Sequence, residues 1–196
     1  MTQSVVVLVI GIPGAGKSVL INRAASSPPW KVLDPDRFRS RLPPELRRLP
    51  IPYPLFVLAV VVAIAIDPQV VVESRGSNAW LRRLIAVCAR ARGRKAVLIL
   101  LDAPSGEAVA GQRSRGRVAP KPVMRWNATE WRRVLNGARS GALATEGWSK
   151  VLLLDRAQAS TIEDLGEVLV SPPPVRPQEP PPGDRHAEVR DDDSRE

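Results

Sequence analysis

The segment from Gly11 to Ser18 has the residue types and the spacing of a phosphate-binding loop. It reads GIPGAGKS, which fits the P-loop (Walker A) pattern G-x-x-x-x-G-K-[ST], and it follows an apolar run. In such a loop successive backbone N–H groups converge on the β-phosphate, Lys17 reaches the β- and γ-phosphates, and Ser18 offers its hydroxyl to Mg²⁺. The motif predicts an ATP-binding protein that uses Mg²⁺. The expected nucleotide-binding residues are Gly11, Ile12, Pro13, Gly14, Ala15, Gly16, Lys17, Ser18 and Val19.

Short apolar segments alternate with helical patterns along the first 170 residues. Unbroken β-branched runs such as 5–10 are typical of strands that are buried on both faces of a parallel sheet. The pattern predicts an α/β fold, a three-layer P-loop NTPase fold with a mostly parallel five-stranded sheet. We expect strands over 5–10, 31–33, 70–72, 96–101 and 151–154, and helices over 17–25, 55–66, 77–92, 107–115, 129–138 and 162–170.

Several signals bear on the ends and the burial of these helices. Ser77 is expected to cap the third helix, in which Trp80, Leu81, Leu84, Ile85 and Cys88 recur at helical spacing. Ser160 and Glu163 have the spacing of a capping box at the start of the last helix. The twelve apolar residues 55–66 are too few for a membrane span and predict a buried helix. The stretch 37–54 is too rich in proline for a long helix.

Charge and composition divide the chain into two parts. Residues 171–196 carry four Arg against seven Asp and Glu, a net of −3, so the net charge of +9 leaves about +12 on residues 1–170. A basic domain favours polyanionic partners such as nucleotides or nucleic acids. We therefore expect a nucleotide-binding domain over 1–170 and a Pro-rich, acidic, disordered tail over 171–196.

The single histidine, the single cysteine and the N-terminal sequence limit the possible chemistry of the domain and the expected location of the protein. The only histidine, His186, lies in the predicted tail, so a histidine base or ligand is excluded for the domain. The only cysteine, Cys88, allows no disulfide within the chain. With no signal-peptide pattern at the N-terminus, the expected location is the cytoplasm, without a membrane partner.

Four motifs in order resemble the P-loop kinases of the polynucleotide 5′-hydroxyl kinase and zeta-toxin-like type. They are GIPGAGKS, DPDRFR at 34–39, VVVE at 70–73 and QRSRGR at 112–117. The resemblance spans about residues 5–155, and only the phosphate loop is highly specific. It implies an ATP-dependent phosphotransferase of the wider P-loop NTPase group.

The resemblance assigns the acceptor side to the second motif. Its members carry D-x-x-R after the second strand, with the aspartate as general base for the acceptor hydroxyl and the arginine on an acceptor phosphate. Asp36 and Arg39 match that spacing. Asp34 is a competitor, because it directly follows the strand, and either aspartate could instead cap a turn.

The resemblance also implies a metal carboxylate after the third strand. Family members usually have an aspartate there, and the first carboxylate in this sequence is Glu73. Glu73 and Ser18 are therefore the expected metal residues. Alternatively, Ser74 occupies the acidic position, which would leave Mg²⁺ to Ser18 and the phosphates and would slow catalysis.

The fourth motif corresponds to a lid whose arginines neutralise the charge of the transferred phosphoryl group. Arg113, Arg115 and Arg117 lie in this segment. Arg115 is the better match to the family, while Arg113 would substitute for an arginine at the position of Gly111. Lys17, Asp36, Arg39, Arg113 and Arg115 are the expected catalytic residues.

Two further features have structural interpretations beside functional ones. Asp102 follows the fourth strand and is interpreted as a cap or turn residue. Trp126 and Trp131, near the basic residues Arg125, Arg132 and Arg133, could stack on bases. Packing of the tryptophans against the sheet is the favoured interpretation.

Three functions remain open from the sequence. The leading one is a kinase that transfers the γ-phosphate of ATP to a hydroxyl on a nucleic acid 5′-end, a nucleotide or a small molecule. The second is a nucleotide-dependent binding or regulatory module with little turnover, which the departures at Ser74 and Gly111 favour. The third is a toxin-like kinase that harms its host.

Overall fold

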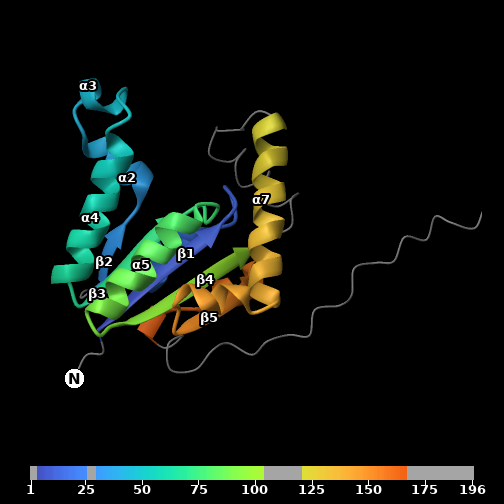
Figure 1. Ribbon diagram of the computed structural model, residues 1–196. Coiled ribbons are helices and arrows are strands. Elements are labelled where there is room, and N and C mark those ends of the chain that lie inside the picture. The colour runs from blue at the N-terminus through green and yellow to red at the C-terminus, as the bar shows by residue number, and fades with distance from the viewer. Residues whose placement is uncertain (1–3, 26–29, 104–120, 167–196) are drawn as a thin grey trace, which may run out of the picture.

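The computed structural model contains a five-stranded sheet between two layers of helices (Figure 1). It describes residues 4–25, 30–103 and 121–166, with side chains in the last range from Thr129 onward. All neighbouring strands are parallel, in the order β2-β3-β1-β4-β5. This confirms the predicted α/β fold and its five-stranded sheet. The strands are β1 (Val5–Gly11), β2 (Trp30–Leu33), β3 (Gln69–Ser74), β4 (Lys95–Asp102) and β5 (Lys150–Asp155).

The first strand is the centre of the molecule. All seven residues of β1 are buried, since β3 and β4 pair with its two edges and helices cover its two faces. This environment explains why the run from Val5 to Ile10 is apolar without alternation. The phosphate loop therefore starts from the most enclosed strand of the sheet.

One face of the sheet is covered by α4 (Pro52–Ile66), α5 (Ala79–Ala91), α7 (Lys121–Arg139) and the 3-10 segment η1 (Ala142–Glu146). Side chains of Val6, Leu8 and Ile10 point into this layer. The other face is covered by α1 (Lys17–Ala24) and α8 (Arg156–Thr161), against which Val5 and Val7 pack. Successive side chains of β1 point to opposite faces of the sheet, so they are divided between two cores.

The helices that follow β1 and β3 lie on opposite faces of the sheet. Leu20 of α1 packs with the core that contains Val7, whereas Ile85 of α5 packs with the core that contains Leu8. In parallel sheets a crevice opens at the carboxyl ends of two neighbouring strands whose connections diverge in this way. The topology therefore places the ligand site between β1 and β3, where the phosphate loop begins.

The stretch between β2 and α4 contains two short helices, α2 (Pro35–Arg41) and α3 (Pro44–Arg47). Each has proline in its first turn, where the missing N–H costs no hydrogen bond. The prediction that 37–54 holds no long helix is correct, but α2 was not predicted. The α4 helix begins at Pro52, three residues before the predicted start at Leu55.

The predicted cap and apolar face of α5 need two corrections. The side chain of Asn78, not Ser77, accepts the capping hydrogen bond from Leu81 N at 3.2 Å. The cap lies one residue later than predicted, and the helix turns Trp80 outward, where the residue is 58% exposed. The inward position is taken by Arg82, which is buried.

The predicted start of the last helix is wrong, because residues 156–161 form a separate helix, α8 (Arg156–Thr161), and the next helical residues that the structure describes are 165 and 166. Ser160 lies inside α8, where its hydroxyl donates to Ala157 O, so it caps nothing. The capping box at this point is formed by Asp155 and Gln158, which exchange hydrogen bonds between side chain and backbone. The predicted helix over 107–115, the end of the one over 162–170 and the tail from 171 onward lie outside the described residues.

The sequence predicted a buried helix here, but α4 is buried on one side only. Phe56, Val60, Ala63 and Ile64 face the core, and the opposite side of the helix is exposed. The reason is its place at one side of its layer, where it contacts α5 and the short helix α2 and leaves its other side open (Figure 1). None of the described helices is long and apolar enough to span a membrane.

Candidate nucleotide and metal site

The phosphate loop joins β1 to α1 with the backbone conformation that its glycines allow. Gly14 and Gly16 have φ of 90° and 100°, a region that other residues rarely adopt. Gly16 is the N-cap of α1, and the helix begins at Lys17. The start of a helix presents its first backbone amides and the positive end of its dipole, here toward the loop. The strand, loop and helix that the motif requires are all present.

The ammonium group of Lys17 is enclosed by the loop. It donates hydrogen bonds to Gly11 O at 2.9 Å and to Ile12 O at 3.2 Å, and the residue is only 6% exposed. Burying an ammonium group is costly unless its donors are satisfied. The loop thus holds a fixed positive charge beside the helix N-terminus, which is the arrangement needed to bind the phosphates of a nucleotide.

Ser18 and Glu73 come together across the β1–β3 crevice. The Ser18 hydroxyl donates to Glu73 Oε1 at 3.3 Å, and the Lys17 Nζ lies 3.9 Å from the same oxygen. The strand register produces this contact, because Glu73 is paired with Val9, two residues before the loop. Ser74, the alternative acidic position, instead accepts a hydrogen bond from Gly76 N at 3.3 Å.

The two oxygens fit the requirements of Mg²⁺. This ion takes oxygen ligands at about 2.0–2.1 Å in octahedral geometry, so adjacent ligands lie about 3 Å apart. Ser18 Oγ and Glu73 Oε1 are 3.3 Å apart. Within the described residues no group of three or more His, Cys, Asp or Glu could hold a metal. A site of one hydroxyl and one carboxylate therefore leaves the remaining positions to water and phosphate oxygens.

The pKa of Glu73 is raised above its ordinary value. Burial is the largest cause, and the carboxylates of Asp34 and Asp36 raise it further, while Lys17 and the hydrogen bond from Ser18 lower it. Asp34 and Asp36 therefore lie near enough to Glu73 for their charges to act on it.

Asp34 and Asp36 occupy different positions in α2. Asp34 is the N-cap, and its Oδ1 accepts hydrogen bonds from Asp36 N at 2.8 Å and Arg37 N at 3.3 Å. Its other oxygen lies 3.7 Å from Arg37 Nε. Asp36 is exposed in the first turn. The carboxylate of Asp34 is thus occupied in capping α2, whereas the carboxylate of Asp36 takes no part in the cap.

Arg39 holds two short helices together. Its Nη2 donates to Arg47 O at 2.7 Å, and Arg47 in turn donates to Leu42 O and Ser40 O at 2.7 and 2.6 Å. The exposed guanidinium of Arg39 lies one helical turn after Asp36 on the same helix. Its sequence-based role on an acceptor phosphate stays a prediction.

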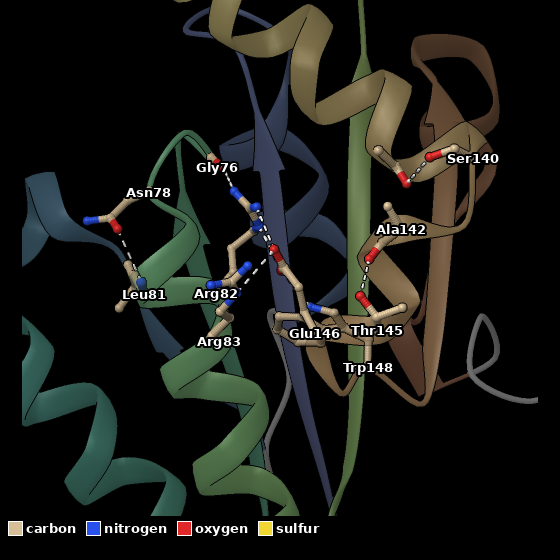
Figure 2. A network of polar contacts seen from close by, with 11 residues as sticks. Gly76, Asn78, Leu81, Arg82, Arg83, Ser140, Ala142, Thr145, Glu146 and Trp148 are labelled. Atoms are coloured by element: carbon tan, nitrogen blue, oxygen red, sulfur yellow. Dashed lines mark hydrogen bonds and ion pairs between the residues drawn. The ribbon is translucent and has the colours of Figure 1, made fainter.

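A buried ion pair braces the loop that follows β3 (Figure 2). Arg82 donates to both carboxylate oxygens of Glu146, at 2.8 and 3.1 Å, and also to Gly76 O. Gly76 has φ of 81°, and a Cβ there would lie 2.7 Å from Ile10 Cβ. The loop between β3 and α5 is thereby fixed against β1.

Sequence reasoning missed this pair, although it left one signal. Arg82 falls among the inward positions of α5, between Leu81 and Ile85, and a charge at such a position needs a buried partner. Nothing in the sequence singles out Glu146, which lies on η1, far along the chain. Trp148 Nε1 also donates to its carboxylate at 3.4 Å.

The remaining predicted residues have mixed outcomes. Asp102 accepts a hydrogen bond from Trp131 Nε1 at 3.2 Å and lies 3.9 Å from Arg139 Nη2, so it anchors α7. Trp131 is buried in the core, which confirms the packing interpretation. Arg133 pairs with Glu130 at 2.5 Å on the exposed side of α7. The lid arginines Arg113, Arg115 and Arg117, and the side chains of Arg125 and Trp126, lie outside the described residues.

Solved structures with the same fold are similar to most of this chain. The PezAT toxin–antitoxin system of Streptococcus pneumoniae matches with a TM-score of 0.63 and 14% identity over 80% of this chain and 69% of that one. A gluconokinase from Sinorhizobium meliloti 1021 matches with a TM-score of 0.57 and 17% identity over 83% and 89% of the two chains. The tunicamycin resistance protein of Deinococcus radiodurans matches with a TM-score of 0.51 and 16% identity over 82% and 94%.

Sequence comparison identifies a family for this chain but no similar curated protein. No curated protein sequence matches the chain. A family model described as an AAA domain matches residues 6–138, which contain the phosphate loop, Glu73 and the second motif. With the P-loop geometry, these findings agree: the chain belongs to this AAA domain family and has a P-loop NTPase fold, which it shares with a gluconokinase.

Proposed function

We propose that this protein is a kinase that transfers the γ-phosphate of ATP, with Mg²⁺, to a hydroxyl acceptor. The observation that carries the proposal is the meeting of three groups at the β1–β3 crevice. They are the enclosed ammonium of Lys17, the Ser18 hydroxyl with Glu73, and the aspartates of α2, which are close enough to raise the pKa of Glu73. Phosphate, metal and acceptor functions thus share one site.

The loop and its lysine would hold the triphosphate. In the proposed complex Lys17 exchanges the carbonyls of Gly11 and Ile12 for β- and γ-phosphate oxygens, and the α1 amides bind the β-phosphate. Ser18 and an ionised Glu73 would hold Mg²⁺, which neutralises charge on the phosphates when bound. These groups position and stabilise the phosphoryl group, which is most of what catalysis of its transfer requires.

Asp36 would act on the acceptor. The acceptor oxygen forms a bond to the γ-phosphorus as the bond from that phosphorus to the β–γ bridging oxygen breaks, and ADP leaves with the electron pair. Asp36 takes the proton of the acceptor hydroxyl and later releases it to water. The exposed position of Asp36 supports this role, since its carboxylate caps no helix and can approach a bound acceptor.

The acceptor belongs to a class that a basic surface attracts. The five arginines Arg37, Arg39, Arg41, Arg47 and Arg48 lie in the α2–α3 segment beside Asp36, in a chain with net charge +9. Such a segment favours an acceptor that carries phosphate, for example a nucleotide or a nucleic acid 5′-end. An uncharged sugar would gain nothing from these arginines.

The test is transfer of label from γ-³²P-ATP with Mg²⁺ to three acceptor panels at matched concentration. The panels are 5′-hydroxyl oligonucleotides, nucleoside monophosphates and neutral sugars, with Lys17→Ala protein as the background control. We expect labelled product from one of the two phosphate-containing panels. Label that stays in ATP with every panel, while ATP binds, would favour the nucleotide-dependent binding module and overturn the proposal.

A further inference from the structure

The outward side of the α4–α5 layer carries a group of exposed apolar side chains. Among the described residues nine large apolar side chains are exposed, and six of them belong to this group. We call it the outer apolar face. Its members are Ile51, Leu58, Val62 and Ile66 along α4 and its N-cap, and Trp80 and Val87 on α5.

The α4 members form a continuous stripe. They are spaced by seven, four and four residues, and the half-exposed Leu55 fills the first interval. Residues at this spacing share one side of a helix. That side is opposite to the buried residues of α4, such as Val60 and Ala63, so the stripe points away from the sheet.

The two helices are joined at both ends by side-chain hydrogen bonds. At the amino ends Asn78 Nδ2 donates to Tyr53 Oη at 2.9 Å. At the carboxyl ends Arg92 donates to Ala65 O at 3.0 Å, and Arg94 donates to Asp67 O. The face is therefore held in shape without a partner, which lowers the entropy lost when a partner binds.

Charge indicates what kind of partner fits. No charged residue occurs in α4 from Pro52 to Ile66, whereas α5 exposes Arg83 and Arg90 beside the face. A nucleic acid or an acidic protein would be recognised through arginines, which the stripe lacks. Its occupant must be equally apolar and uncharged, and the same stripe on a second copy of this chain meets that description.

The area is sufficient for self-association. At roughly 100 Å² for each exposed large apolar side chain, the six members supply about 600 Å². Leu55, Ala59 and Ala65 lie between them and bring the face close to the value of about 800 Å² per partner in stable interfaces. Patches of this size are rarely left open to water on a monomer.

We propose that the outer apolar face is the interface of a homodimer, with α4 packed antiparallel on α4 of a second copy across a two-fold axis. In this arrangement Leu58 meets the partner's Val62, and Ile66 meets the partner's Leu55. The arginines of α5 lie at the border, so the interface core holds no charge. The proposal does not depend on the kinase reaction.

The test is sedimentation velocity of the full chain from about 1 to 100 µM. The chain mass is 21.4 kDa, so a dimer has twice that mass, about 43 kDa. Val62→Asp and Leu58→Asp each bury a carboxylate in the apolar interface, which should weaken the dimer at least about a hundredfold. Ala157→Asp, at an exposed position of α8 on the other side of the sheet, is the control with the same charge change and should stay dimeric.

Salt dependence and folding complete the test. Two chains of net charge +9 repel each other, so raising NaCl from 50 to 500 mM should tighten an apolar dimer. Both aspartate variants should keep the wild-type circular dichroism spectrum, because the replaced side chains point outward. A wild-type chain that is monomeric at 100 µM overturns the proposal. So does a dimer that dissociates in salt or that survives both aspartate substitutions.

Discussion

The two sides of the candidate site are built in different ways. On the nucleotide side, Lys17, Ser18 and Glu73 project from buried strands or from the helix that directly follows one, and their contacts cross the centre of the sheet. On the acceptor side, Asp36 and Arg39 lie on a seven-residue helix with no buried residue. The nucleotide side is fixed by the fold, whereas the acceptor side is held by local capping contacts.

This difference separates groups that the fold holds in place from groups that can change orientation. Groups on central strands cannot move without disturbing the core, since β1 is buried along its whole length. Groups on α2 and α3 can change orientation at the cost of a few exposed hydrogen bonds, such as Arg39 to Arg47 O. We therefore expect the acceptor side to rearrange when a substrate binds.

The largest expected effect is at Lys17. Lys17→Ala removes the charge that the loop encloses and should lower phosphoryl transfer at least about a hundredfold and weaken ATP binding. Isothermal titration with ATP and the transfer assay measure the two effects. Lys31→Ala, which removes an equal charge from an exposed position of β2, should leave both unchanged. Equal affinity of wild type and Lys17→Ala for ATP would show that the phosphate loop does not bind the nucleotide through Lys17.

The next effect tests the acceptor side. Asp36→Asn removes the carboxylate base while it keeps the shape of the side chain, so transfer should fall about a hundredfold with ATP affinity unchanged. Asp34→Asn is the matched control. Asparagine can still cap α2, so this variant should stay near the wild-type rate and melting temperature. If Asp34→Asn loses transfer and Asp36→Asn does not, the two roles are reversed.

A smaller effect is expected at Glu73, with opposite signs for activity and stability. Glu73→Gln should weaken the apparent affinity for Mg²⁺ about tenfold to a hundredfold, because it removes the charged ligand. Wild-type activity should fall at low pH as Glu73 becomes protonated. Since its pKa is raised, this fall should begin at a higher pH than for an ordinary glutamate, and Glu73→Gln should lack it.

The stability of the same variant gives an independent check. A carboxyl group with a raised folded-state pKa stabilises the protein most at pH values below its ordinary pKa, and this contribution is lost as the pH rises through the folded pKa. Glu73→Gln has no such loss. Its melting temperature should therefore exceed that of wild type at neutral pH and approach it at acid pH. A lower melting temperature at pH 7 would show that the pairing with Lys17 outweighs burial.

The phosphate loop and the strand and helix that flank it could be predicted from the sequence because their signals are local. The phosphate loop is a contiguous motif, and Glu73 lies near the end of an apolar strand whose pairing with β1 brings it to Ser18. The same reasoning gave the parallel sheet and the helices α1, α5 and part of α7. Their apolar periodicity reflects burial, which is what shapes such patterns.

Signals failed where contacts join distant segments or where short polar caps decide the structure. Arg82 and Glu146 are 64 residues apart, and no local pattern pairs them. The α2 helix depends on Pro35 and the cap at Asp34 instead of on an apolar stripe. The partial exposure of α4 was missed because uniform hydrophobicity does not show which side faces the sheet.

The smallest expected effect on activity is at Arg39, and it sharpens the comparison most. Arg39→Ala removes a guanidinium that holds α3 through Arg47 O and that the second motif assigns to an acceptor phosphate. If it binds that phosphate, the acceptor KM should rise about tenfold for acceptors with a phosphate and stay unchanged for those without one, with kcat nearly constant. Arg41→Ala, at the exposed end of the same helix, is the matched control and should change neither value. If Arg39 only supports α3, Arg39→Ala should change the KM for both classes of acceptor equally. Arg39→Lys should then also give no difference in KM between acceptors with and without a phosphate. A selective change in KM would show that Arg39 is part of the acceptor site as well as a structural contact of α3. Such a double role is expected in a region that is held by exposed hydrogen bonds.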